Sequence, residues 1–391
     1  MKILILDEEF PYQINTGKRT RSFNLYRRLV KQFKIYYVGY GEYRSLAAEA
    51  LRKEGIEPIT VSAQIPQKQG PLFYLRLLAN LCSPFPYIVT SHYSTVYQDV
   101  VQDSLIELQP DLLICEWTPY AIYVKKLSFL KKLLSTHNIE ADIWQRYYQN
   151  ETNGLRRWYI GKQWRKVELF ERKALHWMNG ALAVSELDRK CLAQWCPGLP
   201  TTVISNGVDL DYFQPLPQPE NRRNLVFTGS MDWRPNQDAA RYFVREILPL
   251  LRQVRPDLEC TFVGRNPPAD IQALADVAGV HITGTVEDVR PYVECAAVYV
   301  VPLRIGGGSR LKILEAMAMG RAVVSTSVGA EGLDVIHNQQ VLLADDPRTF
   351  AESVLGLLDD PGRCRKLAME GRRLVEQCYG WDALADQLSN F

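Results

Sequence analysis

Short apolar runs alternate with longer amphipathic segments along the whole chain of 391 residues. Such alternation is expected of parallel β-strands joined by helical crossovers, with helices covering both faces of each sheet. A first series of strands is predicted at residues 2–6, 35–39, 111–115, 133–136 and 180–184, with helices at 19–33 and 91–108. We therefore expect a doubly wound sheet in the N-terminal half.

A second series of strands is predicted at residues 224–228, 259–263, 281–283, 297–302, 322–326 and 341–344, with helices at 236–252, 309–319 and 361–377. Three prolines, Pro215, Pro217 and Pro219, stop regular structure between the two series. We predict domains at residues 1–200 and 201–377, and a C-terminal helix at about 378–391 that packs back on the first. Since ligands bind at the carboxyl ends of strands in open α/β sheets, we expect one cleft between two facing domains.

Composition places the chain among soluble globular proteins. Hydrophobic residues make up 47% and charged residues 23%, which excludes a disordered chain. The eight cysteines form no Cys-x-x-Cys pair, so we expect a reduced, cytoplasmic compartment and no zinc site. The most apolar longer stretch, residues 71–89, is interrupted by Arg76, Pro84 and Pro86, and no membrane-spanning helix is predicted.

The charge is distributed unevenly between the two halves. Residues 1–200 carry 27 Lys and Arg against 19 Asp and Glu, or +8, whereas residues 201–391 carry 19 against 25, or −6. The acidic half argues against a nucleic-acid-binding chain. Within residues 154–173, seven cations and several aromatic residues accompany two glutamates. This segment is either a helix at the anionic inner face of a plasma membrane or a solvated helix whose aromatic side is core.

The most informative segment runs from Gly306 through Gly307 and Gly308 to a predicted helix. Glycines let the backbone approach a ligand closely, and amides at a helix N-terminus favour an anion such as phosphate. Arg310 and Lys312 add positive charge, and Glu315 lies on the same helix face as Lys312. The alternative is a solvent-exposed Lys–Glu pair of small energetic weight. Neither a Walker loop nor a dinucleotide-binding glycine motif is present.

Residues 204–213, 227–236 and 306–332 together resemble the retaining glycosyltransferases of family 4. The form Gly-Gly-Gly-Ser-Arg-Leu-Lys at 306–312 is most similar to sugar transferases of bacterial exopolysaccharide clusters. The resemblance covers the C-terminal half almost continuously and the N-terminal half loosely. It implies the GT-B fold of two facing Rossmann-like domains, and transfer with retention of configuration by front-face attack, without an enzyme nucleophile.

The resemblance also implies site residues. Donor-binding positions would be Gly17, Gly229, Asn236, Val286, Gly306, Gly307, Gly308, Ser309, Leu311 and Glu315, and catalytic ones His137, Arg310 and Lys312. Glu315 would hold the nucleotide ribose, but Gly307 stands where the family has a second glutamate near the donor sugar. The family usually has an Arg and a Lys that bind the diphosphate, but Ser230 and Asn236 stand at or near those positions in this sequence. Arg310 and Lys312 are therefore the candidates for the missing positive charge.

The expected substrates are a nucleotide-sugar donor, UDP-sugar ahead of GDP-sugar, and a glycan or lipid-linked acceptor. No metal or other cofactor is expected, because Asp209 and Asp211 fall in the interdomain motif and pre-placed amides and cations can stabilise a leaving diphosphate. Two alternatives stay open at this point. One is a nucleotide-sugar epimerase or hydrolase of the same fold, and the other is a catalytically inactive nucleotide- or glycan-binding subunit.

Overall fold

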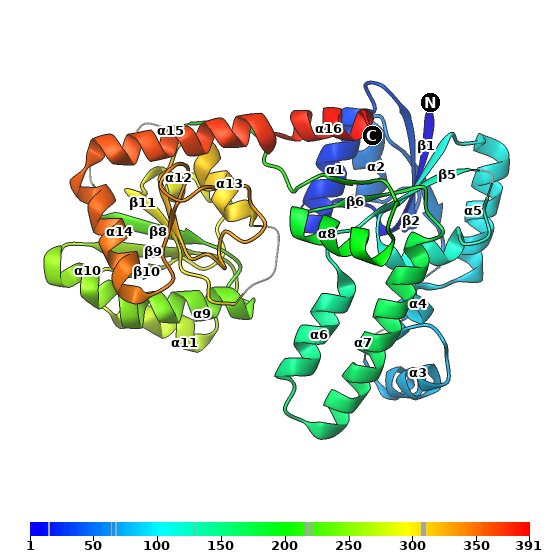
Figure 1. Cartoon of the computed structure of the whole chain (residues 1–391), viewed down its shortest axis with the longest axis horizontal. Coiled ribbons are helices and arrows are strands. Elements are labelled where there is room, and N and C mark those ends of the chain that lie inside the picture. Colours follow the sequence, from blue (N-terminus) through cyan, green and yellow to red (C-terminus); the bar gives the residue numbers. More distant parts are fainter. Residues whose placement is uncertain are drawn as a thin grey trace. The chain divides into compact units, whose positions relative to one another are not determined.

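The computed structural model describes residues 1–14, 16–63, 65–66, 69–128, 130–215, 219, 222–305 and 310–391. The chain divides into two compact units, and each is built on a parallel sheet with helices on its faces (Figure 1). The first unit comprises Met1–Ser205 and Ala385–Phe391, and the second comprises Asn206–Leu384. The predicted α/β class with two doubly wound sheets is confirmed.

The sheet of the first unit has seven strands in the order β3-β2-β1-β4-β5-β6-β7. Their bounds are β1 Lys2–Glu9, β2 Lys34–Tyr40, β3 Glu57–Val61, β4 Leu112–Cys115, β5 Lys131–Ser135, β6 Gly180–Ala183 and β7 Thr201–Val203. All pairs are parallel. The strand order reverses between β1 and β4, so residues that follow these two strands lie at the topological switch point.

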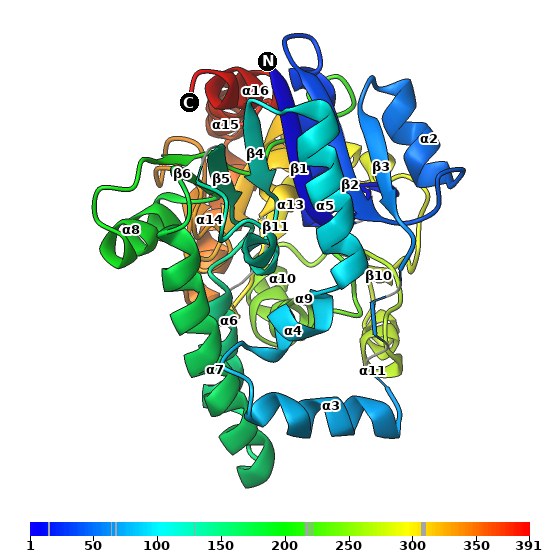
Figure 2. The same ribbon diagram turned by 90° about the vertical axis from the view of Figure 1, so that its right-hand side faces the viewer.

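Helices of the first unit are α1 Gly17–Leu29, α2 Leu46–Lys53, α3 Pro71–Leu81, α4 Tyr87–His92, α5 Thr95–Leu108, α6 Glu140–Asn150, α7 Gly154–Leu175 and α8 Glu186–Trp195, with the 3₁₀ helix η1 at Thr118–Tyr123. The prediction of one helix at 91–108 was wrong in its first turn. Ser94 is extended and its hydroxyl accepts a hydrogen bond from the Tyr97 amide, which starts a separate helix. Helices α3, α6 and α7 extend away from the sheet (Figures 1 and 2).

The sheet of the second unit has six strands in the order β10-β9-β8-β11-β12-β13. Their bounds are β8 Asn224–Thr228, β9 Glu259–Val263, β10 Val280–Ile282, β11 Val298–Val301, β12 Val323–Ser325 and β13 Leu342–Leu343. The bounds of β8 and β9 agree with the sequence prediction at both ends. Here the strand order reverses between β8 and β11, so the ends of these strands define the second switch point.

Helices of the second unit are α9 Arg234–Tyr242, α10 Leu248–Val254, α11 Ala269–Gln272, α12 Arg290–Glu294, α13 Leu311–Ala318, α14 Pro347–Asp359 and α15 Pro361–Cys378, with a π-helical turn η2 at Phe243–Ile247 and a 3₁₀ turn η3 at Ala273–Asp276. The predicted continuous helix 236–252 is therefore interrupted. Pro249 has no N–H to donate to the carbonyl of Arg245, which accounts for the irregular turn before it.

The boundary between the units falls between Ser205 and Asn206, because β7 pairs with β6 and extends the first sheet beyond residue 200. The last helix, α16 Trp381–Ser389, begins in the second unit, and its final residues belong to the first. The Gln387 side-chain amide donates to the Val203 carbonyl at 3.0 Å. Among the residues described, no helix combines the length and apolar character needed to cross a bilayer.

Candidate functional site

The carboxyl end of β8 carries Gly229, which lies where a side chain would collide with two polar groups. A Cβ at this position would lie 2.6 Å from Lys312 Nζ and 2.7 Å from Asn236 Nδ2. Its amide donates to the Val263 carbonyl at 2.8 Å, which ties the end of β8 to the end of β9. Gly229 thus leaves space for a lysine and an amide at the switch point.

Lys312, in the first turn of α13, is held beside Asn236 of α9. Its ammonium donates to Asn236 Oδ1 at 2.7 Å and lies 4.0 Å from the centre of the Phe227 ring. Asn236 Nδ2 donates to the Ser230 carbonyl at 2.8 Å, which fixes the direction of the amide. Burial lowers the pKa of Lys312 to about 7, although the charge of Glu315 opposes the shift. The structure thus brings together three predicted site residues, Gly229, Asn236 and Lys312.

Glu315 lies one turn further along α13 and is partly buried. Within residues 222–305 and 310–391, no hydrogen bond or ion pair reaches its carboxylate. Burial raises the pKa of Glu315 to about 7, against the charge of Lys312. The alternative of an exposed Lys–Glu pair is wrong, since Lys312 bonds to Asn236 instead. Glu315 is a carboxylate with acceptor capacity left for a ligand.

Arg310 precedes α13 with φ 52° and turns its side chain to Glu331. Its Nη2 lies 3.0 Å from Glu331 Oε2, and its Nε donates to the Glu331 carbonyl at 3.2 Å. The predicted catalytic guanidinium is therefore engaged in an ion pair. Leu311 is the first residue of α13, and Val286 packs against the core of the second unit. Gly306, Gly307, Gly308 and Ser309 lie outside the described residues.

Arg265 is a cation beside Gly229 that the sequence reasoning missed. Its Nε donates to Ser230 Oγ at 2.8 Å and lies 3.5 Å from Asp232 Oδ2. A Cβ on the preceding Gly264 would lie 1.9 Å from the Gly229 carbonyl oxygen, so the loops after β8 and β9 touch through their backbones. The signal was available, because Gly264-Arg265 directly follows a strand predicted at 259–263.

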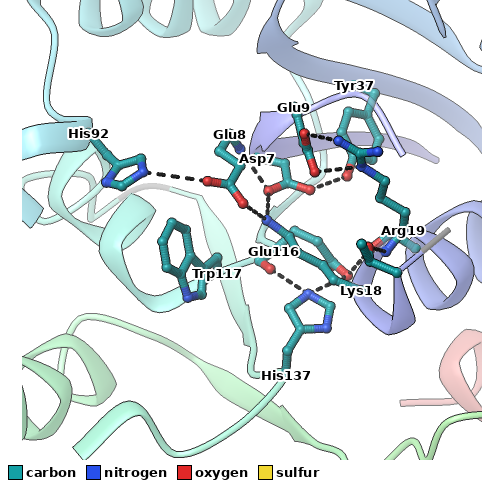
Figure 3. A network of polar contacts seen from close by, with 12 residues as sticks. Asp7, Glu8, Glu9, Lys18, Arg19, Tyr37, His92, Glu116, Trp117 and His137 are labelled. Carbon is teal, nitrogen blue, oxygen red and sulfur yellow. Dashed lines mark hydrogen bonds and ion pairs between the residues drawn. The ribbon is translucent and has the colours of Figure 1, made fainter. Parts of the chain in front are cut away.

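The switch point of the first unit holds a dense network of charged side chains (Figure 3). Lys18, from the start of α1, lies 2.6 Å from Asp7 Oδ1 and 2.9 Å from Glu8 Oε1. Burial raises the pKa of Asp7 to about 6 although Lys18 opposes it. Burial also acts to lower the pKa of Lys18, but the charges of Asp7 and Glu8 outweigh it and the pKa is raised. Asp7 and Glu8 belong to the last residues of β1, and the sequence analysis assigned them no role.

His137 follows β5 and points to Glu116, the residue after β4 (Figure 3). Its Nε2 lies 2.8 Å from the Glu116 carbonyl oxygen and 3.4 Å from Oε1 of the carboxylate. The carboxylate also accepts from the hydroxyls of Ser22 and Tyr26. Burial acts to raise the pKa of Glu116, but His137, with Arg21 and Tyr26, lowers it to about 2. A charged, fully buried carboxylate thus orients the imidazole.

The first residues of α1 lie between the carboxylates of β1 and the segment that follows Glu116. Gly17 is its first residue and the Thr16 hydroxyl caps it, while Arg19 forms a two-point ion pair with Glu9 at 2.5 and 2.7 Å. Lys18 lies 5.0 Å from the Trp117 ring, whose Nε1 donates to Glu140 at 2.8 Å. The two cations that follow Gly17, Lys18 and Arg19, are therefore both engaged with carboxylates of β1.

Asp209 and Asp211 are the paired carboxylates of the interdomain motif. Asp209 Oδ1 accepts from the amides of Asp211 and Tyr212 at 3.1 Å each, so this carboxylate stabilises a turn. Across the described part of the chain, no three His, Cys, Asp or Glu side chains are grouped so that they could hold a metal ion.

Comparison with known families adds to this geometry. Residues 222–360, which contain Gly229, Asn236, Lys312 and Glu315, match the family described as "Glycosyl transferases group 1". The chain carries a glycosyltransferase group 1 domain. A Klebsiella pneumoniae protein described as an uncharacterized 44.6 kDa protein in the cps region is 21% identical over 69% of this chain and 71% of its own length.

Other relatives are similar to a smaller part of this chain. The phosphatidyl-myo-inositol mannosyltransferase of Mycolicibacterium smegmatis is 29% identical over 54% of this chain, which spans about half, 55%, of that enzyme's length. Among solved structures, sucrose-phosphate synthase from Thermosynechococcus elongatus has a TM-score of 0.70 at 18% identity, and Anabaena HepE in complex with UDP and glucose has 0.66 at 14%. Both alignments cover 100% of this chain and 98% of the other. The GT-B fold class is thereby confirmed.

Proposed function

We propose that this glycosyltransferase moves a hexose from a nucleoside-diphosphate sugar to a glycan or lipid-linked acceptor, with retention of configuration, in bacterial exopolysaccharide or cell-surface glycan synthesis. The observation that carries the proposal is the hydrogen bond from Lys312 to Asn236 beside Gly229, inside the group 1 domain. One turn further along the same helix, the Glu315 carboxylate has no hydrogen-bond partner among the residues that the structure describes. The complex of HepE with UDP and glucose and the cps-region relative support it.

In this proposal the second unit stabilises the leaving group. Negative charge develops on the diphosphate as the glycosidic bond breaks, and Lys312 is already placed to meet it without reorganisation. Glu315 accepts hydrogen bonds from the ribose hydroxyls. Arg265 is a second residue that binds the phosphates in this proposal. About half of its side chain is exposed, and its contacts with Ser230 and Asp232 do not use all five of its N–H donors. No metal is required for these steps.

The first unit provides His137 in the proposed mechanism. Its Nε2 is directed to Glu116, and its Nδ1 has no partner among the residues that the structure describes. A donor sugar or an acceptor hydroxyl can therefore meet Nδ1. His137 acts as a binding group, and the departing phosphate takes the acceptor proton in the front-face reaction that the family resemblance implies.

Peripheral contact with an anionic membrane is part of the proposal. Leu72, Leu75 and Leu78 form an apolar face on α3 and are 59–65% exposed. Lys166 of α7 donates to the Asn80 carbonyl, which joins this helix to the basic segment. We expect Leu75→Glu to reduce co-sedimentation with phosphatidylglycerol vesicles, whereas Leu46→Glu, at an exposed leucine of α2, should not. Equal binding by both variants would exclude this face.

The proposal is tested by incubating the purified protein with UDP- and GDP-sugars, with and without lipid-linked saccharides, and analysing the products by mass spectrometry. Both bases are included because a Corynebacterium glutamicum relative, 28% identical over 48% of this chain, is described as GDP-mannose-dependent. A glycosylated acceptor, formed also in chelator, is expected. Free sugar or an isomerised donor without acceptor product would indicate a hydrolase or epimerase, and binding without turnover a binding subunit.

A further inference from the structure

The first unit contains a hollow of about 510 Å³ between α4, α5 and the segment that follows η1. Figure 2 shows α4 beyond the lower end of the sheet and α5 running along the sheet. The volume is within the range typical of small-molecule sites, which combine apolar walls with a few polar groups. None of the residues discussed so far as donor-binding or catalytic lines it.

Aromatic rings form the walls of this hollow. Tyr93 stacks on Tyr123 with ring centres 5.5 Å apart and an angle of 16° between the planes. Tyr123 is buried, but Tyr93 is 46% exposed, so one broad aromatic surface remains open. Phe85 adds a further ring. Flat aromatic surfaces pack against the C–H faces of sugar rings. The loss of conformational entropy on binding is small, because each aromatic side chain has only two torsion angles to fix.

The polar groups of the hollow determine the charge of its ligand. Lys125 and Lys126 line it side by side and are exposed, and among the described residues neither forms an ion pair. No acidic side chain belongs to its lining. Within the described residues the Gln98 side chain makes one long contact, 3.5 Å from Nε2 to the Tyr123 carbonyl, so its amide can bond to a hydroxyl. Two unpaired cations beside aromatic rings fit an anionic sugar better than a neutral one.

We propose that this hollow binds an acidic sugar unit, one that bears a carboxylate or a phosphate. Its ring packs on Tyr93, its anionic group lies at Lys125 and Lys126, and Gln98 meets a hydroxyl. If the proposed transferase function holds, the bound unit is a distal residue of the acceptor glycan. The Tyr123 hydroxyl donates to the His92 carbonyl at 2.7 Å, and His92 Nε2 lies 3.5 Å from Glu8, so the wall of the hollow adjoins the network at the end of β1.

The test is calorimetric titration of the full chain with three probes: a glucuronate-containing hyaluronan tetrasaccharide, glucose 6-phosphate and neutral cellotetraose. At least one acidic probe should bind roughly tenfold more tightly than cellotetraose, since the two lysines attract an anionic group and gain nothing from a neutral sugar. The two acidic probes distinguish a carboxylate from a phosphate.

The variant Lys125→Gln/Lys126→Gln should lose that preference, and Tyr93→Ala should weaken binding of the acidic probe. Lys53→Gln, an exposed lysine at the end of α2, is the matched control and should bind normally. Circular dichroism confirms that each variant is folded. Absence of saccharide binding, equal affinity for cellotetraose, or an unchanged double variant would overturn the assignment. A parallel UDP titration separates the two proposals: UDP binding without saccharide binding refutes the hollow and leaves the transferase proposal standing.

Discussion

Each switch point of the molecule holds a partly buried lysine, and the pKa values of the two lysines shift in opposite directions. In the first unit Lys18 contacts two carboxylates, Asp7 and Glu8, and its pKa is raised although burial opposes this. In the second unit Lys312 contacts a neutral amide oxygen and an aromatic ring, and burial lowers its pKa to about 7. Removal from water is common to both, so the partners decide the sign of the shift.

This difference indicates what each site is built to do. A lysine already neutralised by two carboxylates has little to offer an incoming diphosphate, and removing it would leave negative charges buried. A lysine with only neutral partners gains a charge partner when an anion arrives. We infer that the first network is a preorganised scaffold, which sets the positions of His137 and Trp117, and that the second switch point is where phosphate binds.

The largest expected effect concerns the scaffold. Lys18→Gln should destabilise the protein by about 3 kcal/mol, since it leaves Asp7 and Glu8 without a counter-charge. The neighbouring Arg19→Gln breaks a more exposed pair with Glu9 and should cost less than about 1 kcal/mol. Urea unfolding of both variants measures the difference. If Lys18→Gln proved as stable as Arg19→Gln, the scaffold interpretation would be wrong.

The matching change in the second unit should act on activity and leave stability intact. Lys312→Gln keeps a hydrogen bond to Asn236 possible but removes the charge that meets the leaving diphosphate. We expect kcat/KM to fall roughly 100-fold, the loss typical of removing one preorganised donor. The unfolding midpoint should stay equal or rise, because a poorly compensated buried charge is lost. Unchanged turnover would remove Lys312 from the mechanism.

Gly229→Ala tests whether the lysine must hold its place. The new methyl would lie within 2.7 Å of both Lys312 Nζ and Asn236 Nδ2, so one of them has to move. We expect kcat/KM to fall roughly 30-fold from this displacement. Gly154→Ala is the matched control, because a Cβ there meets nothing within 4 Å. Equal activity of the two variants would show that the spacing around Gly229 is unimportant.

Glu315→Ala probes the ribose contact and should have a smaller effect. Two hydrogen bonds from ribose to a carboxylate are exchanged for bonds to water, so UDP affinity should weaken roughly tenfold, with little change in stability. Titration with UDP and with inorganic pyrophosphate distinguishes the roles. The variant should bind pyrophosphate normally, and a parallel loss for both ligands would assign Glu315 to the phosphates instead of the sugar.

Much of this could be predicted from the sequence where the signal is local. The apolar runs at 224–228 and 259–263 became strands with the same bounds, and Lys312 and Glu315 share a helix face as their spacing predicts. The pairing of charges could not be predicted, since it joins residues far apart. Arg310 forms an ion pair with Glu331, and Glu116 accepts hydrogen bonds from side chains of α1 that lie 90 and 94 positions before it. The edge strands β3 and β7 were not predicted, since Pro58 interrupts the apolar run of the first and all three residues of the second are only partly buried.

One carboxyl group of the first unit, that of Glu171, differs from the carboxylates of the network around Lys18, which have basic side chains as partners. Among the described residues no cation forms an ion pair with Glu171, whose carboxylate accepts hydrogen bonds from the amides of Glu140 and Ala141, at 3.0 and 2.9 Å. Burial raises its pKa to about 8, despite those amides. An unfolded glutamate titrates near 4.3, so between about pH 5 and 8 the unfolded chain has released a proton that the folded chain retains.

The sign follows from that difference: Glu171 makes the fold less stable as pH rises through this window. Glu171→Gln cannot ionise, so its urea midpoint should fall less between pH 5.5 and 8, and the change in unfolding free energy across the window should shrink by about 3 kcal/mol. Glu168→Gln, on the exposed side of the same helix, is the control. An unchanged pH dependence in Glu171→Gln would mean that the carboxyl is already ionised in the fold at pH 5.5, and that a buried acid of this unit is stabilised without a cation.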